Sequence, residues 1–381
     1  VLPDGRAVGF AYDANGNLTS ITPPARPAHG FQYDDDDQGT HYSPPDLGSG
    51  IATTRLFYNL DHQVIELRRP DTLSILNSYD PVTGRLTSSA TPRGTYSYSY
   101  DSSTGNLLGV SAPGGAGLTY AYEGSLLSSM TWSGEVTGAL QFTYDNDFRL
   151  VSQQVNGAQS VAFAYDNDGL LTGAGDLSID RQAATGFISA MTLGALTDHW
   201  TYNGFGELAA FSADAGSSPL LSQNFTRDAG GRVEQKVEVV EGTSATLDYE
   251  YDTAGRLREV RKNNVVVESY SYDANSNRTA WTDPWGSGTA TYDNQDRLLT
   301  YGPSSYTYTV NGELLTKVNG TDTTTYAYDI TGALLGVTLP TGIEISYVID
   351  PSQRRIGKRV NGTLVKGWLY QNGTSPIARP M

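Results

Sequence analysis

The sequence predicts an all-β protein, in which tandem β-hairpins form one long antiparallel sheet. Three observations predict this class. A short motif recurs along nearly the whole chain, the segments between its copies alternate polar with apolar residues, and the 42 glycines can supply many tight turns. No helical pattern of useful length interrupts this order. We therefore expect short strands joined by turns throughout.

The recurring motif has the form Y-D-x-x-G-x-L, which we call the YD motif. It stands most clearly at Tyr12–Leu18, Tyr251–Leu257 and Tyr328–Leu334. The tyrosines that begin successive motifs are 21 residues apart at 58 and 79, 79 and 100, 144 and 165, and 251 and 272. This period predicts a single array over residues 1–381 that is a fragment of a larger assembly. Looser copies begin at Tyr33, Tyr58, Tyr79, Tyr100, Tyr122, Tyr144, Tyr165, Tyr202, Arg227, Tyr272, Tyr292, Tyr308 and Ile349.

The aspartate and the glycine of each motif suit a tight turn. The aspartate can accept hydrogen bonds from backbone N–H groups two residues on, and the glycine can adopt the left-handed conformation that closes a bulged hairpin. The tyrosine and the leucine then flank the turn. The residues that we predict to build these structural turns are Tyr12, Asp13, Gly16, Tyr79, Asp80, Gly84, Tyr100, Asp101, Gly105, Tyr165, Asp166, Gly169, Tyr251, Asp252, Gly255, Tyr328, Asp329 and Gly332.

Some copies depart from the motif in ways that test this interpretation. Asn203 replaces the aspartate, and Ser276, Asp296 and Phe148 replace the glycine. A phenylalanine in the left-handed region is strained, so we expect the turn at Phe148 to have a different geometry.

The segments between the motifs predict the strands and a second class of turns. Tyr96–Tyr100 alternates tyrosine with serine, which is typical of a strand with one packed face and one polar face. At the opposite ends of the strands lie second-class turns, several of them with a dipeptide that favours a primed turn. They include Pro3-Asp4-Gly5, Asn156-Gly157, Asn319-Gly320, Asn361-Gly362 and Asn372-Gly373.

Two regions break the regular spacing. Residues 38–54, with Pro44-Pro45 and several glycines, predict a longer loop. Residues 171–200 predict an irregular repeat, in which Ile179–Ile188 can be read as a degenerate motif.

Composition excludes several classes of function. The net charge of −16 argues against a surface that binds nucleic acid, because such surfaces gather lysine and arginine. With no cysteine, the chain has neither disulfides nor thiolate metal sites. No apolar run is long enough to span a membrane, and no signal peptide is visible at Val1. The run Asp34–Asp37 lacks the spacing of a calcium loop and indicates a solvated loop tip.

The length of the array limits the shape that the sheet can take. About 17 motifs would give roughly 34 strands, whereas open twisted sheets rarely exceed about ten strands before they curl or split. We therefore expect the sheet to curl or spiral around enclosed volume.

The motifs at Tyr12–Leu18, Tyr251–Leu257 and Ile349–Gly362 resemble the YD repeats of bacterial Rhs proteins, of the C subunits of Tc toxins and of teneurins. The resemblance covers essentially the whole chain. It implies a hollow β-shell segment of an exported bacterial protein, secreted or at the cell surface, that encapsulates a polypeptide cargo such as a C-terminal toxin. The implied partners are this cargo or flanking repeats of the same protein. Self-association through exposed sheet edges is also expected, and autoproteolysis cannot be assigned to any residue here.

Other functions stay open beside the shell. The same array can build a cell-surface or extracellular filament or adhesion protein that binds glycans or neighbouring copies. Tyrosine rings would bind the glycans, although cross-strand packing of those rings is the simpler interpretation. We predict no catalytic, cofactor-binding or metal-binding residue, because the four histidines are scattered and turn chemistry accounts for each prominent aspartate. The basic cluster Arg354-Arg355 with Lys358-Arg359 indicates a solvated strand face, with a partner site as the alternative.

Overall fold

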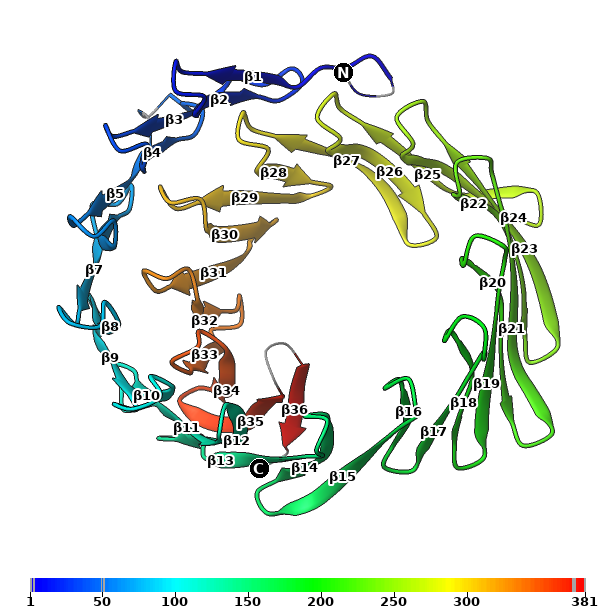
Figure 1. The fold of residues 1–381 in the computed structure, drawn as a ribbon. Coiled ribbons are helices and arrows are strands. Elements are labelled where there is room, and N and C mark those ends of the chain that lie inside the picture. The colour runs from blue at the N-terminus through cyan, green and yellow to red at the C-terminus, as the bar shows by residue number, and fades with distance from the viewer. Residues whose placement is uncertain (1, 3, 49, 51, 372–374, 380–381) are drawn as a thin grey trace. The chain divides into compact units, whose positions relative to one another are not determined.

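The structure is a computed structural model of the 381-residue chain, and it describes all residues except 1, 3, 49, 51, 372–374 and 380–381. The described residues form 36 strands and contain no helix (Figure 1). The predicted class, an all-β array of antiparallel hairpins, is confirmed. In the described part of the chain no helix has the length and hydropathy of a membrane span.

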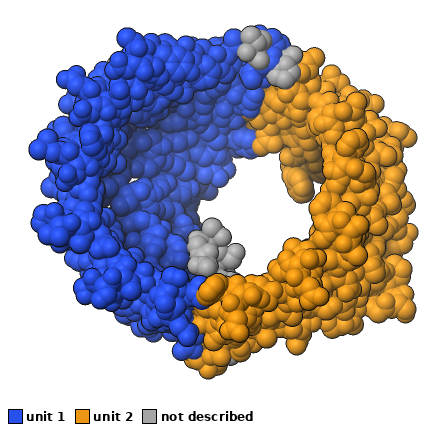
Figure 2. Space-filling model, in the orientation of Figure 1, with its two compact units in different colours: residues 1–141, 274–277, 289–381 blue, residues 142–273, 278–288 orange. Residues whose placement is uncertain are grey.

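The chain divides into two compact units, which Figure 2 shows in different colours. Unit 1 contains residues 1–141, 274–277 and 289–381, and unit 2 contains residues 142–273 and 278–288. We call residues 1–141 the N-terminal stretch, and residues 274–277 with 289–381 the C-terminal stretch.

Strands β1 to β13 lie in or begin in the N-terminal stretch. They are β1 Gly9–Tyr12, β2 Leu18–Thr22, β3 His29–Tyr33, β4 Gly39–Ser43, β5 Thr54–Tyr58, β6 Val64–Arg68, β7 Ser74–Tyr79, β8 Leu86–Thr91, β9 Gly94–Tyr100, β10 Leu107–Ser111, β11 Gly117–Glu123, β12 Leu126–Ser133 and β13 Gly138–Tyr144.

Strands β14 to β26 belong to unit 2. They are β14 Leu150–Val155, β15 Ala158–Tyr165, β16 Leu171–Ala174, β17 Leu177–Arg181, β18 Ile188–Leu193, β19 Leu196–Tyr202, β20 Leu208–Ala215, β21 Ser218–Arg227, β22 Val233–Val240, β23 Thr243–Tyr251, β24 Leu257–Lys262, β25 Val265–Tyr272 and β26 Arg278–Asp283.

Strands β27 to β36 lie in or end in the C-terminal stretch. They are β27 Gly286–Tyr292, β28 Leu298–Tyr301, β29 Ser304–Tyr308, β30 Leu314–Asn319, β31 Asp322–Tyr328, β32 Leu334–Thr338, β33 Glu344–Ile349, β34 Arg355–Val360, β35 Thr363–Gln371 and β36 Ser375–Arg379.

Within each unit, successive strands pair antiparallel, and the register shifts beside the YD motif. Tyr12 faces Leu18 across the first hairpin, and the shift falls between Ala11 and Tyr12. The same shift stands immediately before Tyr165 and before Tyr251. The shift is a β-bulge, which bends the strand and increases its twist. Each motif therefore supplies both the turn and a bend of the sheet.

The most deeply buried apolar side chains lie in unit 1, where two layers of strands meet. Leu118 and Trp132 oppose each other on β11 and β12, and both side chains are essentially excluded from solvent. Ile356 and Leu369, on β34 and β35, are equally buried. Figure 1 shows β34 and β35 beside β11 and β12, and any Cβ added at Gly367 would contact Val136.

Three expectations from the sequence need correction. The first part of the predicted loop at 38–54 is strand β4, because Gly39–Ser43 pairs with β3; the connection itself runs over 44–53. Residues 171–200 are regular, with four strands from β16 to β19. Finally, the turn at Phe148 keeps the usual geometry: φ is 63° and its N–H donates to the carbonyl of Asp145. Its side chain is 72% exposed, and the hydrogen bonds of the turn hold the left-handed conformation.

Candidate functional site: a seam between two rows of turns

The YD turn is held by its aspartate carboxylate. Oδ1 of Asp13 accepts hydrogen bonds from the backbone N–H groups of Asn15 and Asn17, both at 2.9 Å. The N–H of Gly16 donates to the carbonyl of Asp13, and Gly16 has a φ of 91°. Glycine has no Cβ to oppose this conformation. The backbone hydrogen bond from Asn17 lowers the pKa of Asp13.

The other predicted turn residues occupy the same positions. Oδ1 accepts backbone hydrogen bonds at Asp80, Asp101, Asp166, Asp252 and Asp329. The φ angles are positive at Gly84, Gly105, Gly169, Gly255 and Gly332. The structure spreads these turns along the chain, and it brings Asp329 alone among them to the seam described below.

The tyrosine of the motif ties neighbouring hairpins together. In unit 2 the Tyr272 hydroxyl donates to the carbonyl of Leu257, the leucine position of the preceding motif, at 2.8 Å. The same bond to the preceding motif is made by Tyr33, Tyr58, Tyr79, Tyr100, Tyr122, Tyr165, Tyr251, Tyr308 and Tyr370. The recurring spacing of the motif along this chain thus positions a lateral hydrogen bond that period-two alternation alone does not predict.

Two arginines replace this tyrosine and make the same link. Arg227 donates to the carbonyl of Leu208, and Arg181 donates to the carbonyl of Leu171. Gln182 then forms the turn, accepting at its carbonyl from the N–H of Gly186. In the degenerate motif at Ile179–Ile188, Arg181 therefore stands at the tyrosine position and Gln182 at the aspartate position.

A recurrent arginine follows the glycine position and extends the link. Nε of Arg256 lies 2.7 Å from Oδ2 of Asp252, and the guanidinium stacks over the ring of Tyr272 at 4.8 Å. Sequence reasoning missed this role, although its signal was available: the positions equivalent to Arg256 are Arg85, Arg149, Arg232, Arg297 and Arg354.

In unit 1 the YD turns of the C-terminal stretch lie against the second-class turns of the N-terminal stretch. We call this contact the seam. It joins residues 218 to 270 positions apart, and the contacts follow the same order along both stretches. The contacts pair Arg6 with Ala274 and Ser276, Arg26 with Asp296, Pro45 with Gln295, Asp71 with Asn311, Arg69 with Glu313, Arg93 with Asp329, and Trp132 with Asp350.

Arg69 is the most connected residue of the seam. Its guanidinium forms an ion pair with Glu313 and donates to the carbonyls of Asp329 and Ile330. Both partners of the ion pair are largely buried, with side-chain exposures of 11% and 15%. Beside it, the side chain of Asn311 donates to Asp71 at 2.6 Å. Removing one partner of such a buried pair leaves an unpaired charge, which is strongly destabilising.

Asp350 is a second buried anchor, with no solvent exposure. Trp132 donates its Nε1–H to Oδ2 of Asp350 at 3.1 Å, and Arg354 lies 2.8 Å from the same carboxylate. Arg359, on β34, donates to Glu135 at 2.7 Å. The predicted solvated face therefore fails at Arg354, whose side chain is 13% exposed, whereas Arg355 is exposed and Arg359 makes its ion pair at the surface.

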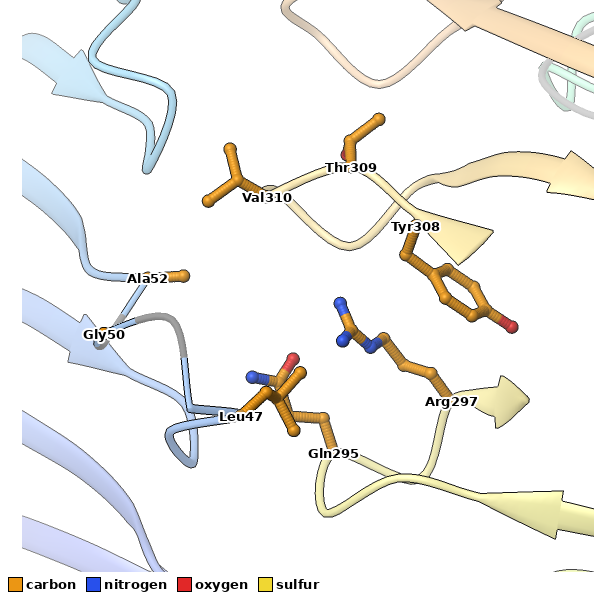
Figure 3. A pocket seen from close by; sticks show the side chains of 8 residues that line it. All are labelled: Leu47, Gly50, Ala52, Gln295, Arg297, Tyr308, Thr309 and Val310. Atoms are coloured by element: carbon orange, nitrogen blue, oxygen red, sulfur yellow. The ribbon is translucent and has the colours of Figure 1, made fainter. Parts of the chain in front are cut away.

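A cavity of about 280 Å³ lies in the seam and is lined by residues of both stretches. Figure 3 shows Arg297 pointing into the space between Gln295 and Val310. The charge of Arg297 is balanced by Asp293 at 2.7 Å. This cavity is slightly smaller than the roughly 300–1,000 Å³ of typical ligand sites, whereas a second cavity of the seam, lined by Arg69 and Glu313, has about 420 Å³. The smaller cavity lies where turns of the two stretches pack against each other.

The histidines do not come together. His29 lies 2.9 Å from the Tyr42 hydroxyl, His41 contacts Thr40, and His62 contacts Gln38. Among the described residues, no group of three or more histidines or carboxylates is arranged to hold a metal ion.

Comparisons with known proteins identify the architecture. The family model for the Teneurin YD-shell matches residues 1–378. Teneurin-3 of Danio rerio is 25% identical over 385 residues, and Teneurin-3 of Mus musculus is 25% identical over 402 residues. These alignments cover 94% and 99% of this chain but 14% of each relative, so the chain spans about one seventh of their length.

Solved structures give the same fold. The crystal structure of TcdB2-TccC3 matches with a TM-score of 0.70 at 15% identity, covering 98% of this chain and 25% of that one. The TcdB2-TccC3-TEV structure matches with a TM-score of 0.69 at 13% identity, covering 98% and 24%.

Proposed function

Because the chain belongs to the teneurin YD-shell family, a family of structural shells, we propose that it is a non-enzymatic wall segment that encloses a polypeptide cargo. In this proposal residues 1–381 act as one array, and flanking repeats of a larger protein complete the wall. The cargo is a polypeptide such as a C-terminal toxin, carried by an exported or cell-surface protein. A bacterial source follows the resemblance to Rhs and Tc repeats, whereas the curated relatives come from fish and mouse.

The seam is the observation that carries this proposal. A wall must hold successive rows of hairpins against each other without filling its interior. In unit 1 the rows are joined at their turns by Arg26, Arg69 and Arg93, each paired with a carboxylate of the other stretch. Strand faces are thereby left available, because the joining side chains lie at the turns.

The lateral tyrosine bonds support the same role. Each one links a hairpin to its predecessor, so the sheet resists separation along its length. The rings are engaged by arginine stacking at Tyr165, Tyr251 and Tyr272, which leaves less of their surface for a glycan. This favours the wall over the adhesion protein.

An electron cryomicroscopy map of the purified chain tests the interior. The proposal expects solvent-filled space beside the sheet, wide enough for an extended peptide. An adhesion rod would instead show a dry core in which tyrosine and leucine side chains interdigitate, and that result would overturn the proposal.

Cargo protection can be tested in the longer natural protein that carries this segment. Limited proteolysis should leave the cargo intact in the native assembly and digest it after Arg69→Ala opens the seam. Arg258→Ala is the matched control, because Arg258 is an exposed arginine in unit 2 that pairs with Glu250. Equal digestion of the cargo in the native protein and the Arg69 variant would contradict the enclosing role.

A further inference from the structure

One tyrosine ring of the C-terminal stretch lacks the cation that its counterparts carry. In six described copies of the YD motif, the arginine after the glycine position lies over the tyrosine ring of the next motif. The pairs are Arg85 with Tyr100, Arg149 with Tyr165, Arg232 with Tyr251, Arg256 with Tyr272, Arg297 with Tyr308, and Arg354 with Tyr370. Before Tyr328, Glu313 takes the position of this arginine. In the part of the chain that the structure describes, no cation lies over the Tyr328 ring.

The larger cavity of the seam, of about 420 Å³, is lined by this ring. Its volume lies within the roughly 300–1,000 Å³ of typical ligand sites. Both stretches of unit 1 contribute to it, and three of its aliphatic side chains stay partly open to solvent: Leu73 at 45%, Val310 at 53% and Leu315 at 42% exposure. Because these side chains line one cavity together with Tyr328, they form a contiguous apolar wall beside the uncovered ring.

The cavity also carries negative charge that the seam does not balance. Glu313 and Asp329 form close ion pairs with Arg69 and Arg93, respectively. Asp71 lines the same cavity and is 26% exposed, and its own contact with Arg69 is longer, at 3.8 Å. Three carboxylates therefore share two guanidinium groups, which leaves one negative charge in excess. A further positive charge in the cavity is attracted to it.

We propose that this cavity binds an organic cation, an ammonium or guanidinium group on an apolar stem. The cation lies over the ring of Tyr328, where an arginine lies in the other copies, and near the carboxylate of Asp71. The stem lies against the aliphatic wall. A cation is held more strongly over an aromatic ring when water is excluded, and burial of the stem adds hydrophobic stabilisation. This site concerns a ligand and does not depend on the enclosing role proposed above.

Two sources of such a cation can be distinguished by calorimetric titration of the purified chain. Phenethylamine represents a free amine, and N-acetylarginine amide represents a side chain of a polypeptide. Saturable binding of either one supports the site, and the tighter of the two identifies the source. The matched anion is 3-phenylpropanoate, which has the same ring and stem as phenethylamine and a carboxylate in place of the ammonium group. It should not bind.

Leu315→Trp tests the location of the site. The larger side chain occupies part of the cavity and should weaken binding of the cation at least about tenfold. Leu108→Trp is the matched control: Leu108 also follows the leucine of its motif and is 39% exposed, but it does not line this cavity. It should leave binding unchanged. Urea unfolding of both variants checks that each is folded.

Tyr328→Leu tests the ring itself, and it decides the question if Leu315→Trp disturbs folding. Leucine keeps an apolar side chain but removes the aromatic face, so binding of the cation should weaken about two- to fivefold. The proposal would be overturned if neither cation binds saturably or if 3-phenylpropanoate binds as tightly as phenethylamine. Equal weakening by Leu315→Trp and Leu108→Trp, or unchanged binding in the Tyr328 variant, would overturn it as well. None of these results would alter the outcome of the cargo protection experiment.

Discussion

The second-class turns of the N-terminal stretch differ from those of unit 2, although both end the same kind of hairpin. In the N-terminal stretch most of them are longer and several carry charge, as in Arg69–Leu73, where Thr72 has a φ of 68°; the two-residue turn Pro92-Arg93 is an exception in length. In unit 2 they shrink to two residues, as at Gly194-Ala195 between β18 and β19. The difference shows that the YD motif builds the sheet, whereas the opposite turns decide whether that edge binds another part of the same chain.

The pattern of burial follows this difference. Unit 1 contains Leu118, Trp132, Leu140, Ile356 and Leu369 with almost no exposure. In β14 to β26 the most buried apolar side chains are less completely covered, for example Ile179 at 7% and Val260 at 3% exposure. We therefore expect substitutions at the seam to have larger effects than similar substitutions in unit 2.

The largest effect is expected for Arg69→Ala. This change leaves the buried carboxylate of Glu313 without its cation and two carbonyls without a donor. Loss of one partner of a buried pair typically destabilises by about 3–5 kcal/mol. Urea unfolding should show it as a lower midpoint.

Arg258→Ala in unit 2 is the control, because its 59% exposed side chain makes a surface pair with Glu250. Exposed pairs contribute about 0–1 kcal/mol. Similar losses for the two variants would show that the seam has no special role in stability.

A smaller effect is expected for Trp132→Phe. The phenylalanine keeps an aromatic ring but removes the Nε1–H donor to Asp350, whose carboxylate is fully buried. A buried acceptor left short of a donor costs about 1–3 kcal/mol. Trp200→Phe makes the same change in unit 2, where Trp200 donates to Asp198 in a partly exposed setting. Unfolding followed by circular dichroism should show the larger loss for Trp132.

The lateral tyrosine bond should contribute equally in both units. Tyr272→Phe removes the hydroxyl that donates to Leu257 and should cost about 1 kcal/mol. Tyr100→Phe, which removes the bond to Leu86 in unit 1, should cost about the same. Tyr12→Phe should have little effect, because Tyr12 is 61% exposed. Urea unfolding measures both losses of stability. A large difference between the Tyr272→Phe and Tyr100→Phe variants would contradict the view that the repeat makes the same hydrogen bond, with the same contribution, in both units.

The smallest effect concerns the pH dependence of the YD turns. The backbone hydrogen bond from Arg149 lowers the pKa of Asp145 below its ordinary value. A lowered pKa in the folded state means that the unfolded state binds the proton more readily. The stabilisation is therefore complete above the unfolded pKa and is lost as pH falls through the folded pKa.

Asp145→Asn should reduce this acid dependence slightly. Asparagine keeps the oxygen that accepts the backbone hydrogen bonds, as Asn59 and Asn203 do in their own turns. Urea midpoints measured over a series of acidic pH values should fall less steeply for the variant than for the wild-type chain. Identical slopes would show that the ionised form of Asp145 adds nothing to the turn.

At high pH the tyrosines give the opposite dependence. Burial, with the hydrogen bond to Glu268, raises the pKa of Tyr270 to about 12. The folded state then holds its proton more tightly, so stability declines as pH rises above the ordinary tyrosine pKa of about 10. Absorbance of ionised tyrosine measures this shift, and Tyr270 should titrate late.

The sequence predicted the hairpins well because turn chemistry is local. Asp13 and Gly16 lie within one turn, so their spacing alone indicates its geometry. The expectation of a different turn geometry at Phe148 was wrong. It considered only the strain of a positive φ, whereas the hydrogen bonds to the Asp145 carboxylate hold the turn in its usual form.

The seam could not be predicted in the same way. Arg69 and Glu313 are 244 positions apart, and nothing in their local sequence specifies which turn meets which. That pairing depends on how far the sheet bends over many hairpins. The bend accumulates from many small bulges and from strand twist, and the period of the sequence does not report its size. The repeated arginine after the motif glycine was a readable signal, and it indicates the contacts within a row.

A disulfide cross-link tests the seam most directly, because the chain has no cysteine of its own. Nδ2 of Asn311 donates to Oδ2 of Asp71 at 2.6 Å, so the two side chains meet at their tips across the seam. Asp71→Cys combined with Asn311→Cys should therefore form an intramolecular disulfide under mild oxidation, seen as a mass loss and a shift in non-reducing electrophoresis. Asp71→Cys combined with Ser352→Cys, from a YD turn elsewhere in the row, should stay reduced. Failure of the first pair to cross-link, or equal cross-linking of both pairs, would contradict the pairing of turns on which the account rests.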